Sequence, residues 1–375
     1  SEEIFKMLDA GKTIGLEKGG AKFTLEPGSQ LEYSSNSNES MDTLIEEFLK
    51  LLELYKVFIK KFDLKLTDFS LFPFSTVEEA PFISAERYKI MSKYFHRTGT
   101  HGKVMMKHTT SLQLTFSYES REDLERKVNR LLLIKPVLLS ISSNSRIYEH
   151  TDTKYRSFRE MVWNDTDPKR CGDPGKDFWS NGKWTIVDYI EKVLDAPVIF
   201  DVAKKQYLVA PAKPFRNLIN KLDIDSYMFH NSTMFTDIRI KNYIEMRYLD
   251  NPTILLVPGI MLLIESLLTQ DGVWKQFSET LPYKFNEVPS MTKRLNLINK
   301  ESLELWDQNI RPSLLNVIDN IKQNYSKKKR FYLNTLREKI QNIDEFQKKE
   351  IILQNFVEDS VLQFNNNLAK LLTNK

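Results

Sequence analysis

Residues 237–249 read DIRIKNYIEMRYL, and this alternating stretch carries a carboxylate and a guanidinium group that are candidates for the chemistry of the protein. Along it, polar and apolar residues alternate, so Glu245 and Arg247 share one face while Ile244 and Met246 share the other. Because successive side chains of a strand point to opposite faces of a sheet, the alternation predicts a β-strand with one polar face. A carboxylate and a guanidinium group then lie side by side on that face.

Two other segments predict strands that carry polar side chains. Residues 108–117 (HTTSLQLTFS) alternate in the same way, with Gln113 on the wholly polar face. Residues 23–33 (FTLEPGSQLEY) read as one strand kinked by a Pro-Gly pair, with Glu26 and Glu32 on either side of the kink. A polar strand face is either solvated or lines a water-filled groove, and the pattern leaves both interpretations open.

Helices are predicted around these strands from apolar residues that recur at spacings of three and four. Residues 44–59 have this pattern after a run of possible capping residues, and residues 121–140 have it with an interruption at Pro136. A further helix is expected at residues 185–194. From about Pro252 to its end the chain reads as helical.

The composition narrows the class of protein. The chain has 375 residues with 54 Lys+Arg against 50 Asp+Glu, and the net charge of +4 gives no general reason to expect nucleic acid as a partner. Cys171 is the single cysteine, so no intramolecular disulfide can form and a reducing, cytoplasmic location is expected. No signal peptide is expected. The apolar stretch 254–268 is shorter than the roughly 20 residues that a membrane helix needs, so no membrane partner is expected.

None of the common short catalytic signatures occurs in the sequence. It has no Walker phosphate loop, no Rossmann glycine fingerprint, no zinc-ligand spacing and no G-x-S-x-G elbow. With five histidines and one cysteine, a thiol–imidazole or zinc mechanism is disfavoured. Carboxylates and arginines on strands remain as the candidate chemical groups.

Three groups of such residues have both a functional and a structural interpretation. Glu26 and Glu32 suit a hard cation such as Mg²⁺, or are exposed glutamates beside a turn. Glu245 and Arg247 suit a metal ligand next to a phosphate clamp, or form an ordinary ion pair. The third group is the tryptophan-containing segment 159–170, whose two arginines either grip a substrate carboxylate or belong to a capped loop.

Taken together and in order, these stretches resemble the glutamate–cysteine ligases of the plant and proteobacterial type, within the carboxylate–amine ligase group. The resemblance covers about Ile4 to Leu268. The matching stretches are residues 14–17 (IGLE), 25–34 (LEPGSQLEYS), 87–91 (RYKIM), 105–106 (MM), 111–114 (SLQL), 157–172 (SFREMVWNDTDPKRCG) and 239–247 (RIKNYIEMR).

The resemblance implies an α+β fold like that of glutamine synthetase, with a curved, mostly antiparallel sheet that forms a funnel and helices outside it. Residues 1–268 would form the catalytic domain, and residues 269–375 a helical C-terminal region packed on it. A monomer or a homodimer is expected.

The resemblance also implies an activity. ATP and Mg²⁺ would be used to phosphorylate the γ-carboxylate of L-glutamate, and the amine of L-cysteine would displace phosphate to give γ-glutamylcysteine, the first step of glutathione biosynthesis. A carboxylate needs a better leaving group before an amine can attack it, and phosphoryl transfer relies on metals and guanidinium groups. Two alternatives stay open: a ligase for another amine, and a non-catalytic homologue that binds a ligand or partner.

Residue roles follow from the matched motifs. Three glutamates match metal ligands of the family: Glu26, Glu32 and Glu245. Gln113 matches a position that lines the metal and nucleotide site, and Arg247 matches the catalytic arginine that meets the ATP phosphates. Two further catalytic arginines match positions near the glutamate and phosphoryl groups: Arg159 and Arg170.

The sequence departs from the family pattern in a few places. The family usually has an earlier strand with a Gly-x-Glu-x-Glu metal motif, and this motif is not found before Ile14; either the protein lacks those carboxylates or they lie upstream of residue 1. Thr115 stands where the family has asparagine, and His108 where it has arginine. The redox disulfides of the plant enzymes cannot form with Cys171 alone.

Overall fold

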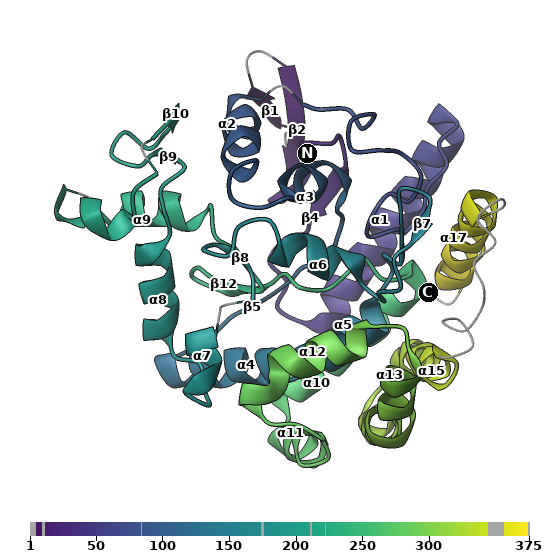
Figure 1. Ribbon diagram of the computed structural model, residues 1–375. Helices are drawn as coiled ribbons and strands as arrows, with labels where there is room; N and C mark the ends of the chain where they lie inside the picture. Colours follow the sequence, from purple (N-terminus) through teal and green to yellow (C-terminus); the bar gives the residue numbers. More distant parts are fainter. Residues whose placement is uncertain are drawn as a thin grey trace.

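The computed structural model describes residues 5–9, 12–83, 85–173, 176–210, 212–221, 223–343 and 356–373. Strands β5, β8 and β12 lie in the middle of the molecule with helices around them, whereas β1 and β2 lie at the top of the view and β9 and β10 at its upper left (Figure 1). The predicted α+β class is confirmed. Within the described ranges, however, the expected funnel is divided into several short sheets rather than one continuous curved sheet.

The N-terminal sheet is an antiparallel meander of four strands in the order β1-β2-β3-β4. Its strands are β1 (Phe5–Asp9), β2 (Lys12–Lys18), β3 (Ala21–Leu25) and β4 (Leu31–Ser34). The predicted single kinked strand 23–33 is therefore wrong: Thr24 pairs with Glu32 across a hairpin. The chain reverses because Glu26 N–H donates to the Gln30 carbonyl at 2.9 Å, with Ser29 in the left-handed region at φ 67°.

The second sheet holds the polar strand face, in the antiparallel order β12-β13-β5. Its strands are β12 (Ile238–Ile240), β13 (Ile244–Met246) and β5 (Leu114–Phe116). The predicted strand 237–249 is thus also a hairpin, which turns where Lys241 N–H donates to the Tyr243 carbonyl at 2.9 Å. Of the predicted strand 108–117, only residues 114–116 pair in the sheet, because a helix ends at His108.

Three two-stranded sheets complete the β structure. They are β6 (Ile147–Tyr148) with β7 (Thr151–Asp152), β8 (Cys171–Gly172) with β11 (Phe235–Thr236), and β9 (Phe200–Asp201) with β10 (Gln206–Val209). The β8–β11 pair is parallel and joins the loop segment after residue 164 to the start of the β12–β13 hairpin.

Helices form where the sequence has a long run of apolar residues at spacings of three and four. The helix predicted at residues 44–59 is α1, whose N-cap Ser40 accepts from the Thr43 N–H, and the break near Pro136 separates α4 from α5. The helices are α1 (Met41–Phe62), α2 (Glu86–Phe95), α3 (Gly102–His108), α4 (Arg121–Leu133), α5 (Lys135–Ser142), α6 (Phe158–Asn164), α7 (Lys176–Ser180), α8 (Ile186–Asp195), α9 (Ile224–Asn231), α10 (Val257–Thr269), α11 (Asp271–Ser278), α12 (Val288–Asn296), α13 (Lys300–Leu305), α14 (Arg311–Ile321), α15 (Lys327–Gln341) and α17 (Phe356–Thr373). The shorter helical turns are η1 (Phe215–Lys221), η2 (Ile254–Leu256), η3 (Phe285–Glu287), the π-helical η4 (Trp306–Ile310) and η5 (Lys322–Asn324).

The main core forms where α10 packs against the C-terminal helices and the β12–β13–β5 sheet. Helix α10 is buried almost all round, and it approaches α15 so closely that a Cβ on Gly259 would lie 2.7 Å from the Tyr332 carbonyl oxygen. This core crosses the proposed boundary at residue 268, and the division into two domains stays a prediction. Among the described helices, none is by itself long and apolar enough to cross a membrane; α10 and α11 pass that test only as a pair bent by 98°.

Candidate active site

Glu245 lies at the centre of a group of cations on the polar face of β13. The antiparallel register of β12 and β13 places Arg239 directly opposite it, and the two guanidinium nitrogens Nη2 and Nε donate to its carboxylate at 2.7 and 2.8 Å. Lys241 lies 3.2 Å and Arg247 2.5 Å from the same carboxylate. Burial by itself would raise the pKa of Glu245, but Arg247 and Arg239 outweigh it and hold that pKa well below its usual range.

Arg247 follows on the same face, as its spacing from Glu245 predicted. Its Nη1 donates to the Gln113 side-chain oxygen at 3.0 Å as well as to Glu245, and its guanidinium carbon lies 5.8 Å from the Trp163 ring centre. The Nε atom is buried and has no hydrogen-bond partner within the described ranges. Burial, followed by the charge of Arg239, lowers the pKa of Arg247. Part of this buried cation is therefore left for a ligand to satisfy.

Arg159 supports Arg247 from α6. Its guanidinium group donates to the backbone carbonyls of Arg247 at 3.1 Å and of Tyr248 at 3.3 Å, and it lies 5.2 Å from the Trp163 ring centre. The side chain is almost fully buried, and this burial lowers its pKa to about 10. In this geometry Arg159 holds the segment after β13 in place; its predicted role at the glutamate substrate stays a prediction.

Arg170 lies just before β8 and is completely buried. Its Nε donates to Asp167 at 2.8 Å and its Nη1 to the Thr233 hydroxyl at 2.8 Å. Its Nη2 donates to the Tyr94 hydroxyl at 3.2 Å and to the Pro197 carbonyl. All three nitrogens thus have protein partners, which is the pattern of a structural ion pair, and a catalytic role for Arg170 stays a prediction.

Glu26 and Glu32 come from the β3–β4 hairpin, whose turn packs against α3. Burial and the charge of Glu32 raise the pKa of Glu26 to about 7, while Arg87 and Arg247 oppose the shift. These causes place Glu26 within electrostatic reach of both arginines and of Glu32. The hairpin therefore brings the first candidate carboxylates to the same site as Arg247, which lies more than 200 residues away in sequence.

Arg87 on α2 is a site residue to which sequence reasoning gave no role. Its Nε is buried and has no hydrogen-bond partner in the described part of the chain, and its guanidinium carbon lies 5.7 Å from the Tyr207 ring centre. The neighbouring Tyr88 hydroxyl donates to the Leu25 carbonyl at 3.4 Å, which attaches α2 to the strand that precedes Glu26. The signal was present, because residues 87–91 belong to the matched stretches.

The predicted metal ligands do not form a ready coordination cluster. Across the described part of the chain, no group of three or more His, Cys, Asp and Glu side chains is arranged to hold a metal ion. Glu26 and Glu32 fit the oxygen chemistry that Mg²⁺ prefers. Both oxygens of Glu245 are engaged by Arg239, so its role as a metal ligand stays a prediction that requires Arg239 to release one of them.

A buried ion cluster next to the site was not predicted at all. The ammonium group of Lys135 lies 2.7 Å from Glu160 and 2.5 Å from Asp237, and all three side chains are almost fully buried. Burial would lower the pKa of Lys135, but the two carboxylates raise it well above its usual range. The backbone carbonyl of Asp237 also accepts from the Arg247 N–H at 2.9 Å. A charged residue in the otherwise apolar run 131–139 was the available signal.

A small cavity lies beside Arg247 and Arg159, with Trp163 and Phe235 among its walls. Its volume is about 10 Å³, which has room for about one water molecule. The side chains around it converge from α6, β11 and the end of β13, so three segments that are distant in sequence meet at the two arginines.

A match to a family model shows the protein family of the chain. The model of glutamate–cysteine ligase family 2 matches residues 2–297, which include both glutamates of the β3–β4 hairpin and the Glu245–Arg247 pair. The chain belongs to this family. The resemblance seen in the sequence is thereby confirmed.

Curated members of the family share modest identity with the chain. The chloroplastic glutamate–cysteine ligase of Nicotiana tabacum is 28% identical over 254 residues, and that of Arabidopsis thaliana is 29% identical over the same length. Each alignment covers 65% of this chain and 48% of the relative. The chain therefore spans about half the length of the curated relatives that it matches.

A solved structure supports the fold. The crystal structure of the glutamate–cysteine ligase of Francisella tularensis in complex with AMP superposes with a TM-score of 0.53 at 14% identity. The superposition covers 94% of this chain and 85% of that chain. It therefore includes helices beyond residue 297, where the family model no longer matches.

Proposed function

We propose that this family 2 chain is an ATP-dependent ligase that joins the γ-carboxylate of L-glutamate to the amine of L-cysteine through a γ-glutamyl phosphate. The product would be γ-glutamylcysteine, the first intermediate of glutathione biosynthesis. The observation that carries the proposal is the buried Arg247 guanidinium, which has an unpaired Nε and lies within electrostatic reach of Glu26 and Glu32.

The arrangement suits phosphoryl transfer because that reaction needs charge stabilisation and positioning rather than a protein nucleophile. The Nη1 atom of Arg247 donates to both Glu245 and Gln113, and these two contacts fix the orientation of the guanidinium group. A preorganised guanidinium group does not have to reorient when charge develops on the transferred phosphoryl group. Arg159 adds to this rigidity through the backbone carbonyls that it holds.

Mg²⁺ would be held by Glu26 and Glu32, where it would neutralise phosphate charge. Arg87, like Arg247, lowers the pKa of Glu26, and it presents a second guanidinium Nε that has no hydrogen-bond partner among the described residues. We assign Arg87 to the same phosphate-binding region as Arg247. Two arginines near a pair of carboxylates suit a substrate whose phosphate groups carry a metal ion.

The test is phosphate release by the full chain with ATP, Mg²⁺ and glutamate, while the amine is varied over cysteine and other amino acids. Mass spectrometry of the product identifies the amide formed. Phosphate release that requires cysteine supports the proposal, and release that requires a different amine supports the alternative ligase. If the full-length protein releases no phosphate with any amine, the protein is a non-catalytic member of the family.

The remaining expectations belong to the same proposal. Small molecules are the proposed partners, with no nucleic acid or membrane involved, and a monomer or homodimer is the proposed state. A cytoplasmic location is proposed from the single cysteine, whereas the plant relatives are named as chloroplastic. Fractionation of cells that produce the natural protein, together with light scattering of the pure protein, tests the location and the oligomeric state.

A further inference from the structure

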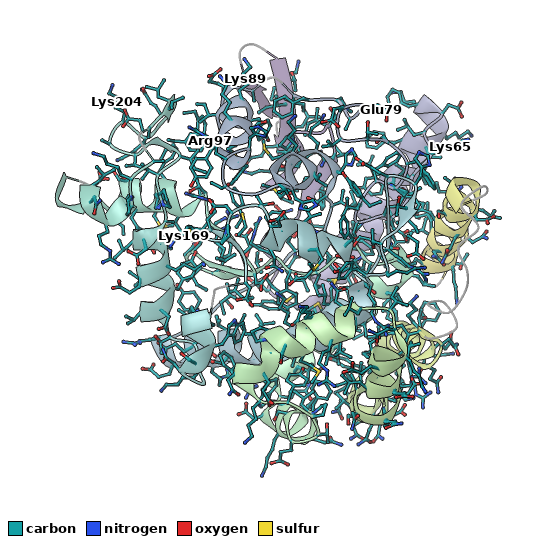
Figure 2. All side chains as sticks on the ribbon, in the orientation of Figure 1. Lys65, Glu79, Lys89, Arg97, Lys169 and Lys204 are labelled. Carbon is teal, nitrogen blue, oxygen red and sulfur yellow. The ribbon has the colours of Figure 1, made fainter. Side chains whose placement is uncertain are left out.

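Lys135 is a buried cation to which the proposed function gives no role. It is the first residue of α5 and is 1% exposed, whereas Lys65, Lys89 and Lys204 lie toward the outer edge of the molecule (Figure 2). A cation in the first turn of a helix opposes the helix dipole, and burying an ammonium group costs free energy. The stability of α5 alone therefore does not explain a lysine at this position.

The partners of Lys135 come from the two segments that carry arginines of the candidate active site. Glu160 follows Arg159 on α6. Asp237 lies just before β12, and its backbone carbonyl accepts from the Arg247 N–H at 2.9 Å. The Lys135 ammonium group lies 2.7 Å from Glu160 and 2.5 Å from Asp237. One ammonium group thus joins α6 to the β12–β13 hairpin beside both arginines.

The two carboxylates share a small cavity with these arginines. Glu160 and Asp237 belong to the walls of the water-sized cavity that Arg159 and Arg247 also line. In the part of the chain that the structure describes, the buried Nε atoms of both arginines have no hydrogen-bond partner. Burial lowers the pKa of Arg159 to about 10, and Asp250, Glu160 and Asp237 oppose this shift. Because buried opposite charges attract strongly, carboxylates without a competing cation would be drawn to the arginines.

We propose that Lys135 is a positioning residue for the phosphoryl-transfer site. By holding the Glu160 and Asp237 carboxylates, it keeps them from forming ion pairs with the two arginines. Arg159 then remains bound to the backbone carbonyls just after β13, and the Arg247 Nε stays available to a phosphate oxygen of the substrate. The inference rests on the proposed function, because it concerns arginines that this function uses. Lys135 itself contacts no substrate.

Phosphate release by the full chain with ATP, Mg²⁺, glutamate and cysteine tests the effect on activity. Lys135→Met should lower the kcat of the folded protein by about tenfold to a hundredfold, since displaced catalytic groups lose rates of this order, with little change in the KM for the amine. Lys135→Arg keeps the charge and should retain most of the activity. Lys322→Met, at a surface pair with Asp319, is the matched control and should leave kcat unchanged. An unchanged kcat in folded Lys135→Met would overturn the proposal.

Neutralising the carboxylates separates positioning from a loss of stability. Adding Glu160→Gln and Asp237→Asn to Lys135→Met removes the charges that would compete for the arginines, so this triple variant should regain most of the kcat per folded molecule. Circular dichroism melts give the folded fraction of each variant. If the kcat of the triple variant stays as low as that of Lys135→Met, the carboxylates are not the cause and the proposal fails.

A double variant provides the test if Lys135→Met does not fold. Lys135→Met with Asp237→Asn keeps only the Glu160 carboxylate of the pair, so it carries one uncompensated charge instead of two. We expect its kcat per folded molecule to be lower than that of the triple variant. Equal kcat values in the double and triple variants would count against the proposal.

Crystal structures of Lys135→Met and of the double variant test the inference independently of turnover. We expect a Glu160 or Asp237 carboxylate oxygen within about 3.2 Å of a guanidinium nitrogen of one of the two arginines, and in the double variant this oxygen should belong to Glu160. Carboxylates that stay apart from both arginines would overturn the proposal. If the wild type releases no phosphate with any amine, the proposed function fails, and the crystal structures still decide whether Lys135 keeps the carboxylates from the arginines.

Discussion

Replacing Lys135 by methionine should destabilise the protein in a way that depends on pH. Methionine keeps most of the side-chain volume but removes the ammonium group that lies 2.7 Å from Glu160 and 2.5 Å from Asp237. All three side chains are almost fully buried, so the two carboxylates would remain without a cation. Removing one partner of a buried ion pair costs about 3–5 kcal/mol, and we expect a loss of this size at neutral pH.

The pH dependence follows from Asp237. Burial raises its pKa to about 7 even with Lys135 beside it, since two carboxylates share one ammonium group. Without Lys135 the pKa rises further. A carboxyl group with a folded pKa above its unfolded value of about 4 stabilises the folded state at low pH, and this stability is lost as the pH rises through the folded pKa. The cost of Lys135→Met should therefore be small near pH 5 and largest above pH 8.

Denaturant midpoints of the wild type and Lys135→Met, measured from pH 5 to 8.5, test this reasoning. Lys135→Arg keeps the charge and should lose less stability at high pH. Adding Glu160→Gln and Asp237→Asn to Lys135→Met removes the uncompensated charges, so the triple variant should show little pH dependence. If Lys135→Met lowers the free energy of unfolding by the same amount at every pH, the loss comes from altered packing and not from the uncompensated buried charges.

Three more predictions concern the candidate active site. Glu245→Gln should abolish phosphate release and also lower the melting temperature, since three cations lose their shared anion; normal turnover would remove Glu245 from the site. Arg247→Lys should lower kcat by about two orders of magnitude with little change in the KM for the amine, whereas Arg337→Lys, at a surface pair with Asp319, should leave kcat unchanged. Gly28→Ala should cost about 1–3 kcal/mol in a thermal melt and reduce activity, because its Cβ would lie 2.1 Å from the Lys107 carbonyl oxygen; wild-type values for both would refute the tight packing of this turn.

Long helices were the most predictable elements of the fold. The periodicity of residues 44–59 located α1, and the proline at residue 136 located the break between α4 and α5, because these signals are local to the segment. The two hairpins were read as single strands. Alternation continues across a tight turn, so the pattern at residues 237–249 did not reveal that Lys241–Tyr243 reverse the chain.

Some features of the candidate site could also be predicted from the sequence, and others could not. The pairing of Glu245 with Arg247 could be read from the sequence, since residues two apart on a strand share a face. The position of Arg239 opposite Glu245 required the hairpin register, and the unpaired Nε of Arg87 required α2 to be placed against β3. For Arg170 the sequence suggested a substrate contact. In the structure each of its guanidinium nitrogens instead donates a hydrogen bond to the protein.

The sequence by itself determined the family, the α+β class and the face that Glu245 shares with Arg247, because these depend on residue identity, order and the two-residue period of a strand. Only the tertiary structure decided that Lys135 meets both Glu160 and Asp237. Those contacts join segments separated by about 25 to 100 residues, and their energies depend on burial and on distances that local periodicity does not encode.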